Sequence, residues 1–268
     1  MSEVPDTEIV GNITFELRPH HRTPSHPEWV CVRKNRKFVN RYLALEKEFR
    51  NCRMVEVGVD QGGGTSFFTK LLQPEALLAI ELSNQPVISV AKFLADEDPE
   101  HRVSIHWGVD QSDRLKVPDL VSATFGDQSL DLVIDDASHV LTPTIATFEM
   151  LFPKLRPGGL FIIEDWSCKH LQEKDLDALI AADPKGKAAQ KLNAAITSAV
   201  GTKFEMPLSL LICQLVIAAG RNPEWITEVR ATDGFCEIRR GTADIAPGTP
   251  ISKYIGLLGG KMLGLNPE

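Results

Sequence analysis

The sequence predicts an α/β protein whose core is a doubly wound, mostly parallel sheet of seven strands that ends in an antiparallel hairpin. Between residues 53 and 166, short apolar runs alternate with segments of helical periodicity, the pattern of strands joined by helical crossovers. The apolar runs are almost uninterrupted, as expected for parallel strands that helices cover on both faces. Later, Asp233-Gly234 separates two strand-like runs within residues 225–241, and Asp-Gly is a strong hairpin signal.

The individual elements follow from these runs in chain order. We expect strands at residues 53–59, 76–83, 102–108, 129–136 and 158–166. We expect helices over residues 28–49, from about Phe67, across residues 85–97 and near Thr142–Leu151. The apolar stretch 208–220 is interrupted by Gln214 and is shorter than the roughly 20 residues that cross a bilayer. It therefore predicts a buried helix, with a strand as the less favoured alternative.

The chain divides into three segments. Residues 1–27 are rich in Pro, His and Thr without a sustained period, so we expect an irregular N-terminal arm. Residues 28–245 form the main domain, and residues 246–268 form a C-terminal tail whose apolar residues suit docking on a neighbouring subunit of a homo-oligomer. The basic side of the first helix is most simply a solvated face, and a lid over an anionic substrate is the alternative. Its members are Arg33, Lys34, Arg36, Lys37 and Arg41.

Composition excludes several classes of partner and location. The 268 residues are 43% hydrophobic and 24% charged, which is typical of a globular chain. The net charge of −7 argues against nucleic-acid binding, which depends on an excess of Lys and Arg. The five cysteines form no CxxC pair, and the acidic N-terminus lacks the features of a signal peptide. We therefore expect a cytoplasmic protein with no disulfide framework, no zinc site and no membrane association.

A glycine-rich loop follows the first central strand in "EVGVDQGGGTS", residues 56–66. Gly62, Gly63 and Gly64 allow positive φ and close approach of a ligand, and the next helix offers free N–H groups to an anion. The lysine of a nucleotide-binding P-loop is missing, and the G-x-G-x-x-G spacing of dinucleotide sites is not met. A tight structural turn explains the glycines alone equally well.

Two acids at the next strand ends favour a ligand site. Glu81 ends the second strand and can accept both hydroxyls of a ribose. Asp110 follows the third strand at the same edge, where it can contact an adenine amino group. Each acid alone fits a helix cap or a solvated loop, but the glycine loop and these two acids follow three consecutive strands, which favours a nucleoside-like cofactor.

The fourth and fifth strands end in "IDDASH" and "IIEDW". Because neighbouring strand ends lie only about 5 Å apart, Asp136 and the Glu164–Asp165 pair can converge. Clustered carboxylates suit a hard divalent ion such as Mg²⁺. The alternative is a set of solvated acids and a helix cap. His139 is close enough in sequence to act as a base on a substrate hydroxyl.

The loop, Glu81 and the strand–helix order resemble the class I S-adenosylmethionine-dependent methyltransferases, which have a Rossmann-like fold. Asp60 replaces the middle glycine of the commonest motif of that family. The resemblance implies S-adenosylmethionine as cofactor, with the methionine carboxylate near Gly62–Ser66 and the adenosine between Glu81 and Asp110. The cofactor-binding residues that it implies are Glu56, Gly58, Gly62, Gly63, Gly64, Thr65, Ser66, Glu81 and Asp110.

"DDASH" followed by "EDW" is similar to the metal-dependent sugar O-methyltransferases of macrolide biosynthesis and their cephalosporin-hydroxylase-like relatives. That resemblance implies Mg²⁺ or another divalent cation on Asp136, Glu164 and Asp165, with His139 as general base. Catechol O-methyltransferases have a lysine base and a final asparagine ligand in the corresponding pattern, so the sugar-modifying branch fits better. Asp135 receives no role.

The sequence therefore predicts an S-adenosylmethionine- and metal-dependent O-methyltransferase of a small-molecule hydroxyl, with a sugar or polyol of a natural product as the expected acceptor. His170 is the rival base, and Trp166 lines either the acceptor pocket or the core. The alternatives are a methyltransferase of a phenolic or catechol acceptor, a hydroxylase-like relative and a non-catalytic cofactor-binding module. Iron-dependent hydroxylation calls for two histidines and a carboxylate, and one histidine is well placed here.

Overall fold

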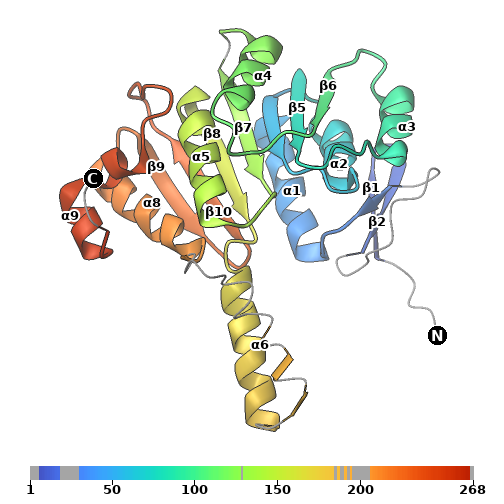
Figure 1. Ribbon diagram of the computed structural model, residues 1–268. Helices are drawn as coiled ribbons and strands as arrows, with labels where there is room; N and C mark the ends of the chain where they lie inside the picture. Colours follow the sequence, from blue (N-terminus) through green and yellow to red (C-terminus); the bar gives the residue numbers. More distant parts are fainter. Residues whose placement is uncertain are drawn as a thin grey trace.

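The computed structural model describes residues 6–18, 30–127, 129–183 and 206–265, with isolated positions between 186 and 194. Its main feature is a seven-stranded sheet in the order β6-β5-β4-β7-β8-β10-β9 (Figure 1). The pairs β6–β5, β5–β4, β4–β7 and β7–β8 are parallel, whereas β10 is antiparallel to both β8 and β9. The predicted fold class is confirmed.

The strands of the main sheet fall close to their predicted positions. They are β4 (Arg53–Val57), β5 (Ala76–Glu81), β6 (Val103–Trp107), β7 (Leu130–Asp135), β8 (Leu155–Glu164), β9 (Ile226–Ala231) and β10 (Phe235–Arg240). Gly234 has a φ of +79° in the hairpin between β9 and β10, as the Asp-Gly pair predicts.

Helices cover both faces of the sheet, and each face has its own apolar cluster. One cluster packs α1 (Arg36–Phe49), α2 (Gly63–Leu72) and α3 (Ile88–Glu97) against side chains such as Met54 and Ile134. The opposite cluster packs α4 (Lys116–Phe125), α5 (Leu141–Leu151), α8 (Ser209–Arg221) and α9 (Ile251–Met262) against side chains such as Val55 and Val133. Adjacent residues of β4 and β7 thus point to opposite clusters, as expected for strands buried on both faces.

The described part of the N-terminal arm is regular, which corrects the prediction of an irregular segment. β1 (Asp6–Val10) and β2 (Ile13–Leu17) form an antiparallel hairpin, and β2 pairs in parallel with the short β3 (Cys31–Val32). Phe15 is fully buried and packs edge-on against Phe67 of α2. The hairpin is therefore fixed by burial of alternate side chains against α2.

The first helix begins later than predicted. The Asn35 side chain accepts a hydrogen bond from the backbone N–H of Phe38, a side-chain cap that starts α1 at Arg36. The preceding residues 31–32 are strand, so residues 28–35 do not extend the helix in the described part of the chain. This shift places Lys34 in a bend before the helix, not on its surface.

The remaining helical segments differ in how well the sequence predicted them. The stretch 208–220 is helical, as predicted, and forms α8; the tail contains α9, which packs on α8 of the same chain. The helix α4, the 3₁₀ turn Phe152–Lys154 and α6 (Cys168–Ala182) were not predicted. α6 projects away from the body of the molecule (Figure 1). No helix in the described part of the chain has the length and apolar character needed to cross a bilayer.

Candidate functional site

The candidate site lies where the strand order reverses. β4 pairs with β5 on one side and with β7 on the other, so the crossovers leave the sheet in opposite directions at this point. Ligands of doubly wound sheets bind outside the carboxyl ends of the strands at such a switch point. A cavity of about 380 Å³ opens there, and its walls include Gly58, Glu81, Asp110 and Asp136.

Glycines allow the strand-end loops to approach each other closely. Gly58 has a φ of +96°, and a Cβ atom on it would collide with the backbone oxygen of Asp136. Gly62 has a φ of +80°, and a Cβ atom there would overlap the side chain of Val90 on α3. Both positions therefore require glycine, and the requirement comes from packing within the chain itself.

Glu81 organises the backbone of the glycine loop. Its Oε2 accepts hydrogen bonds from the backbone N–H groups of Val59 and Asp60 at 2.9 and 3.0 Å. Its Oε1 accepts one from the N–H of Ser83 at 2.8 Å. A carboxylate oxygen has two acceptor positions, so Oε2 is filled and Oε1 retains one position for a hydroxyl donor in the adjacent cavity.

Asp110 stands across the same cavity. Its Oδ1 accepts hydrogen bonds from the backbone N–H and the hydroxyl of Ser112, at 2.8 and 2.7 Å. These bonds hold the pKa of Asp110 below its ordinary value and keep it charged. The structure therefore brings Glu81 and Asp110 to one cavity, as the sequence predicts for an adenosine site.

Glu56, Thr65 and Ser66 lie inside the protein. The Thr65 hydroxyl donates to Glu56 Oε2 at 2.6 Å, and all three side chains are buried. Burial raises the pKa of Glu56 to about 8, although the Thr65 hydrogen bond opposes the shift. A Cβ atom on Gly64 would meet Glu56 Oε1 at 2.5 Å. These residues fix the shape of the loop from beneath, and their side chains do not line the 380 Å³ cavity.

The chain segment before α1 lies over the start of α2. A Cβ atom on Gly63 would collide with the backbone oxygen of Cys31, and Arg33 forms a 2.6 Å ion pair with Asp60. A small cavity of about 40 Å³ remains beneath this segment, bounded by Lys34 and Glu56 among others. The predicted methionine end of the cofactor site is therefore narrow in this conformation.

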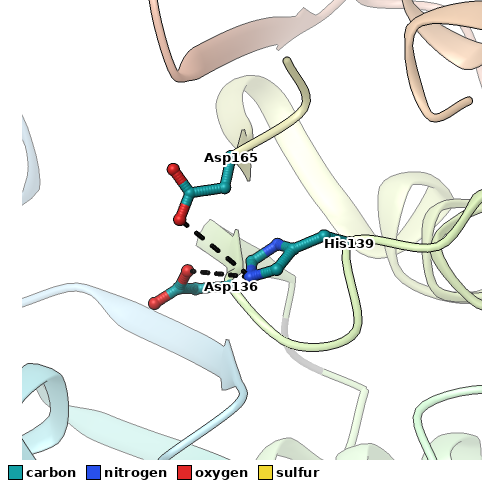
Figure 2. Close-up of side chains that lie close together, drawn as sticks. All are labelled: Asp136, His139 and Asp165. Atoms are coloured by element: carbon teal, nitrogen blue, oxygen red, sulfur yellow. Dashed lines mark ion pairs between the residues drawn. The ribbon is translucent and has the colours of Figure 1, made fainter. Parts of the chain in front are cut away.

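Asp136, His139 and Asp165 converge beside the cavity, from the loops that follow β7 and β8 (Figure 2). One ligand atom from each lies within 4.8 Å of the others. His139 Nε2 is 4.0 Å from both Asp136 Oδ1 and Asp165 Oδ2. His139 and Asp165 have φ angles of +53° and +52°, a left-handed conformation that is uncommon for residues other than glycine and recurs at functional sites.

Lys34 enters the same cluster, a placement that the sequence analysis did not foresee. Its Nζ lies 2.7 Å from Asp136 Oδ2, 2.8 Å from Glu164 Oε2 and 3.9 Å from Asp165 Oδ2. Burial alone would lower the pKa of Lys34, but the three carboxylates raise it above its ordinary value. All three carboxylates that were predicted to hold a metal therefore surround one ammonium group of the chain.

Glu164 is the innermost of the three carboxylates. It is 0% exposed, and its Oε1 accepts a 2.7 Å hydrogen bond from the hydroxyl of Tyr42 on α1. Burial raises the pKa of Glu164, and the Lys34 ammonium opposes this by favouring the charged carboxylate. Burying a carboxylate without polar partners costs free energy. The hydrogen bond from Tyr42 and the ion pair with Lys34 offset this cost for Glu164.

The remaining candidates are placed away from the reacting edge. Asp135 is buried, and both its oxygens accept from the Gln111 amide at 3.2 Å; burial raises its pKa to about 7. Trp166 donates through Nε1 to the backbone oxygen of Thr232 and packs against the core. His170 lies on α6, where its Nε2 is 2.8 Å from the Ser209 hydroxyl.

The donor set suits a divalent cation. Asp136, Glu164 and Asp165 carry three negative charges when ionised and Lys34 carries one positive charge, which leaves a local charge of −2. Carboxylate oxygens are the ligands that Mg²⁺ prefers, and repulsion among them is relieved by a cation. A neutral imidazole nitrogen at the same point is compatible with such a site.

Residues 55–166 match the family model described as a methyltransferase domain. The chain is 40% identical over 73 residues to the 8-demethyl-8-alpha-L-rhamnosyl tetracenomycin-C 2'-O-methyltransferase of Streptomyces olivaceus, covering 27% of this chain and 18% of that protein. It is 30% identical over 161 residues to the mycinamicin VI 2''-O-methyltransferase of Micromonospora griseorubida, covering 56% and 35% of the two. The chain thus spans about a third or less of these curated relatives' length.

Among solved structures, the chain is similar to the MycE methyltransferase from the mycinamycin biosynthetic pathway in complex with Mg and SAH. The identity is 21% and the TM-score is 0.47, over 77% of this chain and 49% of that one.

Proposed function

We propose that this chain, whose residues 55–166 match a methyltransferase-domain family model, is a class I S-adenosylmethionine-dependent methyltransferase that methylates a hydroxyl of a small molecule with the aid of a divalent cation. The observation that carries the proposal is the convergence of Asp136, His139 and Asp165 beside the cavity between Glu81 and Asp110. This arrangement places proton-accepting and cation-binding groups next to the cavity that Glu81 and Asp110 line.

The cofactor would occupy the switch point. Glu81 Oε1 would accept from a ribose hydroxyl, and Asp110 would accept from the adenine amino group. The backbone of Gly62, Gly63 and Gly64 would face the methionine carboxylate at the start of α2, where N–H groups favour an anion. Gly58, Glu56, Thr65 and Ser66 would shape the loop, as their burial and close contacts indicate.

Asp136, Glu164 and Asp165 would hold Mg²⁺ or another divalent ion. The chemistry supplied by such a cation is Lewis-acid stabilisation of the negative charge that develops on the acceptor oxygen. Asp136 and Asp165 are both partly exposed, so they are accessible to an acceptor, whereas Glu164 lies behind them.

His139 would act as the general base. Its Nε2 would take the proton of the acceptor hydroxyl, and the carboxylates of Asp136 and Asp165, each 4.0 Å away, would stabilise the imidazolium that forms. The chain's further contribution is to hold the acceptor oxygen and the methyl group in line, since positioning supplies much of the rate in such transfers.

A sugar or polyol of a natural product is the acceptor class that we propose. Of the two curated relatives described above, one is named for 2'-O-methylation of a rhamnosyl tetracenomycin and the other for 2''-O-methylation of mycinamicin VI. A vicinal diol also suits a cation held by two exposed carboxylates, because both oxygens can approach it. A phenolic acceptor remains the alternative that the same screen distinguishes.

The test is a screen of glycosides, polyols and catechols with purified protein, S-adenosylmethionine and Mg²⁺, in which methylated product is measured by mass spectrometry. We expect methylation of a glycoside that is lost with EDTA and reduced about 100-fold or more in Asp136→Asn, because the variant loses a charged ligand. Asp119→Asn on α4 is the matched control and should retain activity. Activity that survives both EDTA and Asp136→Asn would refute the metal role and leave the methyltransferase role intact.

A further inference from the structure

The ammonium of Lys34 occupies the point on which the three proposed metal ligands converge. Its distances to Asp136 Oδ2 and Glu164 Oε2 are 2.7 and 2.8 Å, and Asp165 Oδ2 is 3.9 Å away. The Lys34 side chain is 16% exposed, and its ammonium also lies 5.1 Å from the centroid of the Phe38 ring. A cation with this many partners is fixed in place, unlike an ordinary surface lysine.

A divalent ion and this ammonium would compete for the same carboxylate oxygens. Glu164 has one oxygen on Tyr42 and the other at Lys34, so it has no carboxylate oxygen free of a polar neighbour to offer a metal. Asp136 likewise directs Oδ2 to Lys34 and Oδ1 toward His139. Two cations that share the same carboxylates also repel each other strongly in a poorly solvated site.

We propose that Lys34 is a tethered counter-cation that a divalent metal must displace from Asp136, Glu164 and Asp165. This inference rests on the proposed function, because it concerns the affinity of the same metal site. In the metal-free protein, Lys34 neutralises carboxylates that would otherwise repel one another. On binding, the metal ion takes over this role, and the ammonium leaves the cluster.

Displacement of Lys34 by a metal ion would also affect the cofactor site, because the segment that carries Lys34 contacts the glycine loop. Lys34 lies in the bend between β3 and α1, one residue after Arg33, which pairs with Asp60 of the glycine loop. The same segment places the backbone oxygen of Cys31 against Gly63. Release of Lys34 therefore loosens one of the contacts that hold this segment over the methionine end of the cofactor site.

The first experiment is calorimetric titration of the full chain with Mg²⁺, without cofactor or acceptor. Lys34→Met removes the charge and keeps an unbranched apolar side chain. Its affinity for Mg²⁺ should be at least about tenfold tighter than that of the unsubstituted protein, which corresponds to about 1.4 kcal/mol. Lys37→Met is the matched control, because Lys37 lies on α1, is 56% exposed and pairs with Asp233 away from the cluster. It should bind Mg²⁺ like the unsubstituted protein.

A second measurement uses the unsubstituted protein and does not depend on the folding of a variant. The rate at which an acetylating reagent modifies Lys34 is followed by peptide mass spectrometry. Saturating Mg²⁺ should raise this rate several-fold, since the ammonium leaves its carboxylates, while the rate at Lys37 should stay constant.

Equal or weaker Mg²⁺ binding by Lys34→Met would overturn the proposal, as would slower or unchanged acetylation of Lys34 on addition of Mg²⁺. Either result, with Mg²⁺ still bound, would leave the proposed metal-dependent function standing. Failure of all three proteins to bind Mg²⁺ would overturn both the exchange and the metal role.

Discussion

At the residue scale, His139 and Asp165 combine unusual backbone geometry with a shared position. Both have φ near +50°, although neither is glycine, and their side chains meet Asp136 from separate loops (Figure 2). Holding two residues in this region costs of order 1–3 kcal/mol each, so the surrounding packing must fix them. The outcome is a compact group of two carboxylates and an imidazole at the mouth of the cavity.

His139→Ala should lower kcat by about 10²–10⁴-fold, because the acceptor hydroxyl loses its proton acceptor. The affinity for Mg²⁺ should change little if His139 acts as a base. A steady-state assay combined with Mg²⁺ titration measures both quantities. His170→Ala on α6 is the control and should keep the unsubstituted rate. A large loss of Mg²⁺ affinity in His139→Ala would instead assign His139 to the metal.

The sequence predicted part of this residue-scale site. Asp136, Glu164 and Asp165 were expected together because parallel strands end at a common edge, and the structure brings them around one point. Lys34 was assigned to a solvated helix face, because no spacing rule connects a residue before α1 with two strand ends far along the chain. Asp135 received no role from the sequence, and its burial against Gln111 now gives it a structural one.

At the element scale, β4 and the loop after it carry the site. Gly58 directly follows this strand with a φ of +96° and lies against the backbone of Asp136. The two strand ends can approach this closely only without a Cβ atom. The position of Asp136 therefore depends on Gly58, which follows the neighbouring strand β4.

Gly58→Ala should lower the free energy of unfolding by about 1–3 kcal/mol or more, because the alanine is strained at positive φ and collides with the Asp136 backbone. Thermal or urea unfolding measures the change. Gly248→Ala is the matched control: its φ is +74°, but nothing lies within 4 Å of the added Cβ. An equal decrease in the free energy of unfolding in the two variants would show that the close approach of Gly58 to Asp136 contributes nothing to stability.

The long central strands were predicted well, and the short N-terminal ones were not. Runs such as residues 76–80 are apolar throughout and predict a strand buried on both faces. β1 and β2 are five residues each and expose several side chains, so their composition is ambiguous. The Gly11-Asn12 pair between them is a hairpin signal that could have identified them. The two-residue β3 exists through its pairing with β2, which local sequence does not encode.

At the scale of the whole molecule, the sheet order explains why distant residues form one site. The reversal between β4 and β7 places the glycine loop, Glu81 and Asp110 on one side of Asp136, while β8 delivers Glu164 and Asp165 on the other. The methyltransferase domain expected from the glycine loop is supported by the family-model match over residues 55–166. The acceptor class is harder to predict from the sequence. Acceptor pockets are built largely from loops, and no fixed residue spacing identifies the loop residues that contact the acceptor.

The central claim is that the switch-point cavity binds S-adenosylmethionine, and calorimetric titration of the purified chain with this cofactor tests it most directly. We expect saturable binding that Glu81→Ala weakens at least about tenfold, because the ribose loses its acceptor and the N–H groups of Val59 and Asp60 lose theirs. Glu100→Ala, whose side chain is 73% exposed beyond α3, should bind as the unsubstituted protein does. The absence of saturable binding, or equal affinity in Glu81→Ala, would contradict the account.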